Sequence, residues 1–216
     1  MRIDLHTHSI FSDGELIPSE LVRRAMALGH SAIAITDHVD ATNVEFVVSN
    51  IVKAADLRDD YIPVIPGVEI THVPPRRIAE VARAARRLGA EIVVVHGETV
   101  AEPVAPGTNA AAAGNPDIDI LAHPGLISEA DAEAAAASGV ALEISGRRGH
   151  SITNGLVAAR ARAAGARMVV NSDAHSPDNL MSEERARVVA LGAGLTAAEA
   201  DLALGPVPYE MVKRLL

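Results

Sequence analysis

The sequence predicts an α/β fold in which parallel strands form a closed or nearly closed barrel surrounded by helices. Seven short runs rich in Ile and Val recur along the 216 residues, and most are followed by a helix-compatible segment. The runs are almost continuously apolar instead of alternating, as is typical of parallel strands buried on both faces. No break in composition divides the chain, so we expect one domain over residues 1–216. An open doubly wound sheet is the alternative, but no glycine-rich phosphate fingerprint follows the first strand.

The predicted elements alternate in chain order. The expected strands are Ile3–Leu5, Ala32–Thr36, Ile62–Val68, Ile92–Val95, Ile118–Ala122, Val140–Ile144 and Met168–Asn171. The expected helices lie at about 18–28, 44–58, 75–88, 129–138, 153–164 and 180–191. Pro18 suits a first helical turn, and Gly29 suits the end of that helix. Residues 97–116 contain three prolines, so we expect a long loop there with a short helix near 108–113.

Composition limits the classes of function. Hydrophobic residues make up 49% of the chain and Cys is absent, so any metal must be held by His and carboxylates. The formal net charge of −9 argues against extended nucleic acid as a partner. No apolar run approaches the roughly 20 residues that span a bilayer, and the N-terminus lacks the pattern of a signal peptide. We therefore expect a cytoplasmic protein with no membrane partner; the sequence does not indicate an oligomeric state.

The first fifteen residues contain the first chemical motif. His6 and His8 end the first strand, and Asp13-Gly14 follows. Residues i and i+2 of an extended segment point to the same side, so both imidazoles can face one ion. A carboxylate brought round by the turn can extend this half-shell of ligands. A polar strand end followed by a Ser-Asp-Gly turn is the alternative interpretation of this motif alone.

Polar residues of the same kind follow the other predicted strands. Six of the nine histidines stand at such ends. In a parallel barrel all carboxyl ends of strands open onto one face, so these side chains converge on one pocket. Without cations, crowded imidazoles and carboxylates would be desolvated and repel one another. The sequence therefore predicts a multinuclear metal site. In strand order, the polar residues that end or follow the predicted strands are His6, His8 and Asp13; Asp37 and His38; Glu69; His96; His123; Glu143 with Arg147, Arg148 and His150; and Asp173 with His175.

These motifs, taken in order, resemble the PHP (polymerase and histidinol phosphatase) family of metal-dependent phosphoesterases. The matching segments are His6-Thr7-His8-Ser9, Ser12-Asp13-Gly14, Thr36-Asp37-His38, Gly67-Val68-Glu69, His96, Ala122-His123-Pro124 and Ser172-Asp173-Ala174-His175. The resemblance implies a distorted, TIM-like (β/α)7 barrel and two or three divalent ions (Zn, Mn or Fe). It places the ligands at His6, His8, Asp13, His38, Glu69, His96, His123, Asp173 and His175.

The resemblance also implies how the ions are shared. His6, His8, Glu69 and Asp173 would hold one ion, Glu69 would bridge to a second held by His96 and His123, and the third would lie between Asp13, His38 and His175. Two divalent ions roughly 3.5–4 Å apart lower the pKa of a bridging water, so that hydroxide can attack phosphorus. Glu69, Asp173 and Asp37 are the expected catalytic residues. Asp37 and Glu98 adjoin ligands in sequence and are candidates for orienting imidazoles.

The segment Gly146-Arg147-Arg148-Gly149-His150 is the expected substrate-binding loop. Arg suits bidentate contacts to phosphate, and the flanking glycines allow close approach; a solvated loop is the alternative. The leading hypothesis is a phosphatase for a small phosphomonoester such as histidinol phosphate. The alternatives are a nucleotidase or 5′–3′ exonuclease of the same family, and a non-catalytic metal-binding or polymerase-accessory module. Neither the phosphate ester nor the metal can be identified from the sequence.

Overall fold

The structure, a computed structural model, describes residues 2–216 and contains one parallel, nearly closed barrel. Seven strands pair in the order β1-β2-β4-β5-β6-β7-β8, and a short eighth strand, β3, pairs with β4. The predicted α/β barrel is therefore confirmed. The strands are β1 Arg2–Asp4, β2 His30–Ile35, β3 His38–Val39, β4 Val64–Ile70, β5 Ile92–His96, β6 Ile120–Ala122, β7 Ala141–Ser145 and β8 Met168–Asn171.

The barrel closes between β8 and β1 through isolated contacts instead of a continuous ladder. A parallel bridge joins Thr7 to Ala174, and the Asp173 amide donates to the His6 carbonyl at 3.0 Å. Nearer the start of the strands, the buried Arg2 guanidinium donates to the Val170 carbonyl at 2.6 Å. These contacts hold the residues after β1 beside those after β8, so the first and last metal-ligand motifs become neighbours.

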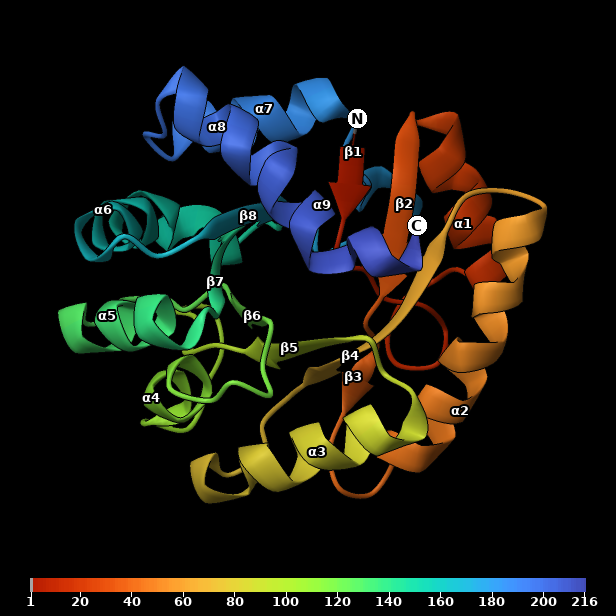
Figure 1. The fold of residues 1–216 in the computed structure, drawn as a ribbon, viewed down its shortest axis with the longest axis horizontal. Coiled ribbons are helices and arrows are strands. Elements are labelled where there is room, and N and C mark those ends of the chain that lie inside the picture. The colour runs from red at the N-terminus through yellow and green to blue at the C-terminus, as the bar shows by residue number, and fades with distance from the viewer. Residues whose placement is uncertain (1) are drawn as a thin grey trace.

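The helices form a ring around the strands (Figure 1). Pro18 begins the first helix, and the other helix boundaries follow the predicted rhythm closely. No helix among residues 2–216 is long and apolar enough to cross a membrane. The helices are α1 Pro18–Ala27, α2 Val44–Ala54, α3 Ile78–Leu88, α4 Thr108–Ala113, α5 Glu129–Ser138, α6 Asn154–Ala164, α7 Glu183–Gly192, α8 Ala197–Leu204 and α9 Pro206–Val212.

Apolar side chains fill two layers, one between strands and helices and one inside the barrel. The inner layer includes Ile3, Ile65 and Ile92, all near the starts of their strands. Val212 of α9 is fully buried among them, and Met211 packs against the same cluster. Helix α9 thus covers the end of the barrel where the strands begin, which leaves the opposite end open for a site.

Several boundaries differ from the prediction. Strand β4 begins at Val64, two residues late, and continues to Ile70, so Glu69 lies inside the strand. The two-residue strand β3 was not predicted; it pairs His38 with Glu69. Helix α7 begins at Glu183 because Ser182 caps it by accepting from the Arg185 amide. Helices α8 and α9 were not predicted, and their packing depends on the assembled barrel.

The covering role of α9 predicts a measurable loss of stability in Val212→Ala. Removing two buried methyl groups should lower the free energy of unfolding by about 2 kcal/mol. The matched control is Val188→Ala on α7, where the side chain is 60% exposed and the change should stay within about 0.5 kcal/mol. Urea unfolding of both variants measures the difference, and equal destabilisation would contradict the burial of α9 against the barrel.

Candidate metal centre

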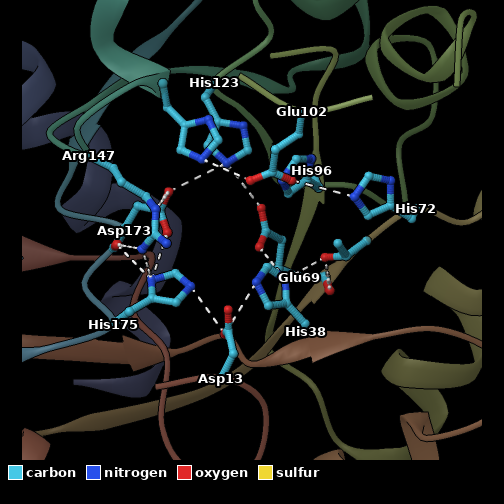
Figure 2. A pocket seen from close by; sticks show the side chains of 12 residues that line it. Asp13, His38, Glu69, His72, His96, Glu102, His123, Arg147, Asp173 and His175 are labelled. Atoms are coloured by element: carbon cyan, nitrogen blue, oxygen red, sulfur yellow. Dashed lines mark hydrogen bonds and ion pairs between the residues drawn. The ribbon is translucent and has the colours of Figure 1, made fainter. Parts of the chain in front are cut away.

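The predicted ligand residues meet at the open end of the barrel. Seven of the nine predicted ligands line a cavity of about 250 Å³, and His6 and His8 are buried beside Glu69. Figure 2 shows side chains pointing inward from opposite walls, with Arg147, Asp173 and His175 facing His72 and His96. The lining residues are Asp13, His38, Glu69, Thr71, His72, His96, Glu102, His123, Arg147, His150, Asp173 and His175.

Glu69 is the residue that most of these imidazoles share. Its Oε2 lies 2.8 Å from His38 Nδ1, 3.4 Å from His6 Nε2 and 3.6 Å from His8 Nε2. Its Oε1 lies 3.3 Å from His123 Nε2. The side chain is fully buried because β4 is covered on both sides. One carboxylate therefore joins groups that come from three parts of the chain.

Asp13 lies close to a second set of imidazoles at the rim of the cavity. Its Oδ1 lies 3.2 Å from His175 Nε2, 3.4 Å from His38 Nε2 and 3.9 Å from His8 Nδ1. Gly14 makes this turn possible, since a Cβ there would lie 2.4 Å from the His8 carbonyl oxygen. The turn after β1 thereby folds back over its own histidines, as the motif predicted.

Asp173 completes the inner wall. Its carboxylate lies 3.3 Å from His8 Nε2, 3.6 Å from His123 Nε2 and 3.7 Å from His6 Nε2. The His6 ring is held in place because its Nδ1 donates to Glu143 Oε1 at 2.8 Å. A ligand imidazole held by a carboxylate on its far nitrogen is the arrangement found around bound metals. Glu143 in the middle of β7 thus holds the orientation of the His6 ring.

Backbone strain is concentrated at this cavity. Within residues 2–216, the non-glycine residues with positive φ are His72, His123 and Asp173, and all three line the cavity. Such conformations cost on the order of 1–3 kcal/mol each and persist only where the surroundings enforce them. They turn His123 and Asp173 into the barrel mouth directly after β6 and β8.

The loops after β5 and β6 lock together beside the site. Gly125 has a φ of +62°, and a Cβ there would lie 1.9 Å from the Glu98 carbonyl oxygen. The Asn109 side chain accepts from the Glu98 amide at 2.9 Å and donates to the Pro124 carbonyl at 2.8 Å. These contacts hold the residues that follow His96 against those that follow His123.

Buried polar atoms without a well-directed hydrogen bond show whether this donor set fits cations. Within the described chain they include His6 Nε2, both ring nitrogens of His8, and both oxygens of Glu69. Burying such atoms unpaired costs several kcal/mol, whereas imidazole and carboxylate are the preferred ligands of Zn, Mn and Fe. The residues therefore fit divalent metal ions.

The electrostatics of the site favour the ligand forms of His8 and Glu69. Burial, reinforced by the nearby His38 and His175 rings, holds the pKa of His8 well below its ordinary value, so the ring is neutral at neutral pH. Burial raises the pKa of Glu69, but His6 and His38 outweigh it and hold the pKa well below its ordinary value. A neutral imidazole and an ionised carboxylate are the forms that bind metal.

Two predicted orienting residues have other roles. Asp37 accepts from the Ser9 amide at 2.8 Å, from Ser9 Oγ at 2.7 Å and from Ser12 Oγ at 2.6 Å. Glu98 Oε1 accepts from the amides of Gly107 and Asn109 at 2.9 Å. Neither hydrogen bond set includes an imidazole, so the assignment of Asp37 and Glu98 to ring orientation was wrong. Asp37 instead fixes the turn that carries Asp13.

The three residues proposed for substrate binding separate into two groups. Arg147 lines the cavity, donates to the Asp173 carbonyl at 3.2 Å and donates to His175 Nδ1. His150 is buried and also lines the cavity. Arg148 is exposed and is not among the lining residues. The loop after β7 therefore directs one arginine into the site and its neighbour away from it.

Glu102 is a site residue that the sequence analysis missed. Its carboxylate lies 3.1 Å from His96 Nε2 and 3.5 Å from His150 Nε2. The hydrogen bond from His96 lowers the pKa of Glu102 to about 2. Glu102 stands six residues after its strand, so proximity to a strand end could not identify it. The available signal was the proline-rich loop itself, because long loops in compact domains are often functional.

The parallel barrel and the buried cluster of His and carboxylate side chains at its open end place the protein among α/β barrels with a site suited to metal ions. Within that class, the model of the PHP domain family matches residues 4–103. The chain is also 51% identical over 218 residues to an uncharacterized protein from Methanocaldococcus jannaschii, with 100% of both chains covered. The chain belongs to the PHP family.

Other relatives point in two directions. Ribonuclease P protein component 3 from Methanosarcina mazei is 29% identical over 226 residues, which cover 98% of this chain and 88% of that protein. The solved structure of histidinol phosphate phosphatase from Lactococcus lactis, complexed with zinc, L-histidinol and phosphate, has a TM-score of 0.66 at 19% identity, covering 90% and 94% of the two chains. A chain in archaeal ribonuclease P with mature tRNA has a TM-score of 0.73 at 17% identity, covering 99% and 90%. These two structures share the fold.

The donor set predicts two to three divalent ions per chain. Elemental analysis of protein purified without chelator, and again after reconstitution with Zn²⁺ or Mn²⁺, measures the stoichiometry. Glu69→Gln should lose at least one ion because this carboxylate joins several imidazoles. His30→Gln is the matched control, since His30 lies at the start of β2 and binds the Met181 carbonyl. A stoichiometry near zero in the reconstituted wild type would contradict the metal centre.

Proposed function

We propose that the chain is a metal-dependent phosphatase that hydrolyses a small phosphomonoester, of the kind represented by histidinol phosphate. The observation that carries the proposal is the convergence of ten His, Asp and Glu side chains with one arginine on a single small cavity. Metal ligands alone are compatible with many hydrolases. An arginine beside them adds a group suited to phosphate.

The ligand groups implied by family resemblance agree with the distances. His6 and His8 with Glu69 form one set whose donor atoms lie within 4.8 Å of one another, and Asp13, His38 and His175 belong to another. His96 and His123 would hold the second ion, with Glu69 as the bridging ligand. Ions of Zn, Mn or Fe bound there would supply positive charge to phosphoryl oxygens and lower the pKa of water.

The protein's own groups would position the ester. Arg147 is held by the Asp173 carbonyl and His175, so its guanidinium is fixed at the edge of the metal cluster. A fixed planar donor can hold two phosphate oxygens and orient the phosphorus toward the cluster. The acidic Glu69 and Asp173, both buried, would hold cations and exclude bulk water from the reacting atoms.

The size and charge of the site favour small esters. A cavity of about 250 Å³ lies at or below the range of drug-sized ligand pockets, which is about 300–1,000 Å³. The chain also has no Trp and only two Phe and two Tyr for stacking on bases. Both features support a compact phosphomonoester over a long polynucleotide.

A second candidate is a subunit of an RNA-containing assembly. Its support is the 29% identity to ribonuclease P protein component 3, which extends over 98% of this chain. In that role the barrel would serve as a binding surface and the metal centre would need no turnover. RNA binding without phosphatase activity would favour this candidate.

A phosphomonoester panel tests the leading function. Purified protein, loaded separately with Zn²⁺, Mn²⁺ or Fe²⁺, should release phosphate from at least one small ester, and chelation should abolish the release. Short single-stranded RNA serves as the second substrate class, with binding and cleavage measured separately. Full metal loading without turnover of any ester would contradict the phosphatase proposal.

The two neighbouring arginines provide a matched pair. Arg147→Ala should raise KM and lower kcat/KM about 100-fold, as expected if roughly 2–3 kcal/mol of charge-assisted hydrogen bonding is lost. Arg148→Ala should leave both constants near wild type because its side chain is exposed. Arg147→Lys should recover activity only in part, since an ammonium lacks the planar fork. Wild-type kinetics in Arg147→Ala would remove this residue from phosphate recognition.

A further inference from the structure

Glu102 lies among three imidazoles on the wall opposite Arg147 (Figure 2). Its Oε2 is 3.1 Å from His96 Nε2 and 3.5 Å from His72 Nε2, and its Oε1 is 3.5 Å from His150 Nε2. The His150 ring also stacks on His123, with centroids 4.2 Å apart. The carboxylate and His150 therefore adjoin His96 and His123, the two histidines proposed to hold the second ion.

His150 is held in an orientation suited to a ligand. Its side chain is buried, and its Nδ1 lies 2.7 Å from Thr99 Oγ1. That contact occupies one ring nitrogen and leaves Nε2 directed at Glu102. Fixing the far nitrogen of an imidazole through a hydroxyl or carboxylate is how proteins orient metal ligands. Thr99 and Glu102 belong to the same loop, so one segment supplies both the orienting hydroxyl and the carboxylate.

The spacing of the donor atoms matches a single coordination shell. Atoms bound to one zinc ion at about 2.1 Å in a tetrahedron lie roughly 3.4 Å apart. The Glu102 oxygens stand 3.1 and 3.5 Å from the nitrogens of His96 and His150. One nitrogen from each of His96, His123 and His150 lies within 4.8 Å of the others. A cation held among these three imidazoles would therefore also lie close to Glu102, which adjoins two of them.

We propose that His150 and Glu102 are ligands of the same ion as His96 and His123. The proposal rests on the metal centre put forward above and adds two ligands to it, from the loops after β5 and β7. Glu102 and His150 would add a carboxylate and an imidazole to this ion, and both are residue types that divalent transition metals accept as ligands. This ion would then tie residues 97–107 to residues 146–153 at the rim of the cavity.

Release of zinc from the full chain tests the two ligands. The protein is loaded with Zn²⁺ alone, freed of excess metal, and mixed with a chromophoric chelator that reports each equivalent as it leaves. His150→Gln and Glu102→Gln should each release one equivalent about 10- to 100-fold faster than wild type, the range known even for residues that only support ligands. The remaining equivalents should leave at the wild-type rate.

Two controls separate ligation from general loosening. His72→Gln removes an imidazole that also adjoins Glu102 but is 46% exposed, and it should leave every release rate unchanged. Glu133→Gln replaces an exposed carboxylate on α5 and should also behave as wild type. Acceleration in His72→Gln equal to that in His150→Gln would overturn the assignment of His150.

Hydrogen exchange of the wild type gives a readout that needs no substitution. Zinc loading should protect the amides of residues 97–107 and 146–153, and Glu102→Gln should lose this protection in the first segment. If the variants do not fold, the wild type alone decides: the proposal is overturned when zinc loading leaves hydrogen exchange in residues 97–107 and 146–153 unchanged. If the wild type binds zinc but its zinc release rate and hydrogen exchange equal those of His150→Gln and Glu102→Gln, the two proposed ligands are wrong and the metal centre stands. Wild type that binds no zinc overturns the metal centre itself.

Discussion

The buried carboxylate of Glu69 is the group on which the rest of the site depends. Four imidazoles, from His6, His8, His38 and His123, lie within 3.6 Å of its two oxygens. Neutral rings leave their own nitrogens unpaired, and the ionised carboxylates of Glu69 and Asp173 repel one another at this depth. Divalent cations resolve both conflicts, because each cation accepts several lone pairs and neutralises the carboxylate. The barrel can bury this cluster because cations would pair its nitrogen and oxygen atoms in place of water.

Strand register makes the cluster possible. His38 pairs with Glu69 across β3 and β4, and Glu69 pairs with Val94 of β5, two residues before His96. Side chains two residues apart point to the same face, so Glu69 and His96 both face the interior of the mouth. The closing contacts between β8 and β1 bring Asp173 to His6 in the same way. Strained backbone at His123 and Asp173 then completes the inward turn.

Sequence patterns within a strand and the residues after it were predictable, whereas contacts between residues far apart in the sequence were not. The apolar strand runs and the polar residues after them follow from local rules, so the barrel and the gathering of its histidines could be inferred. Asp37 was assigned wrongly because neighbours in extended chain point opposite ways, which turns its carboxylate toward Ser9 and Ser12. Glu102 was missed because the packing of Asn109 against Pro124 sets its loop. Helix α9 was missed because Pro206 and Pro208 suggest a loop until the apolar end of the barrel is present to be covered.

Charge separates the two candidate functions. The chain carries 19 Lys and Arg against 28 Asp and Glu, so a polyanion approaching from solution meets net repulsion outside the mouth. A small ester carries few charges and would enter a cavity where the proposed cations and Arg147 supply positive charge. A polynucleotide needs many phosphate contacts, and its affinity falls steeply with salt. An RNA-bound role would therefore depend on basic surface supplied by other members of an assembly, whereas hydrolysis of a small ester depends only on groups that this barrel itself brings together.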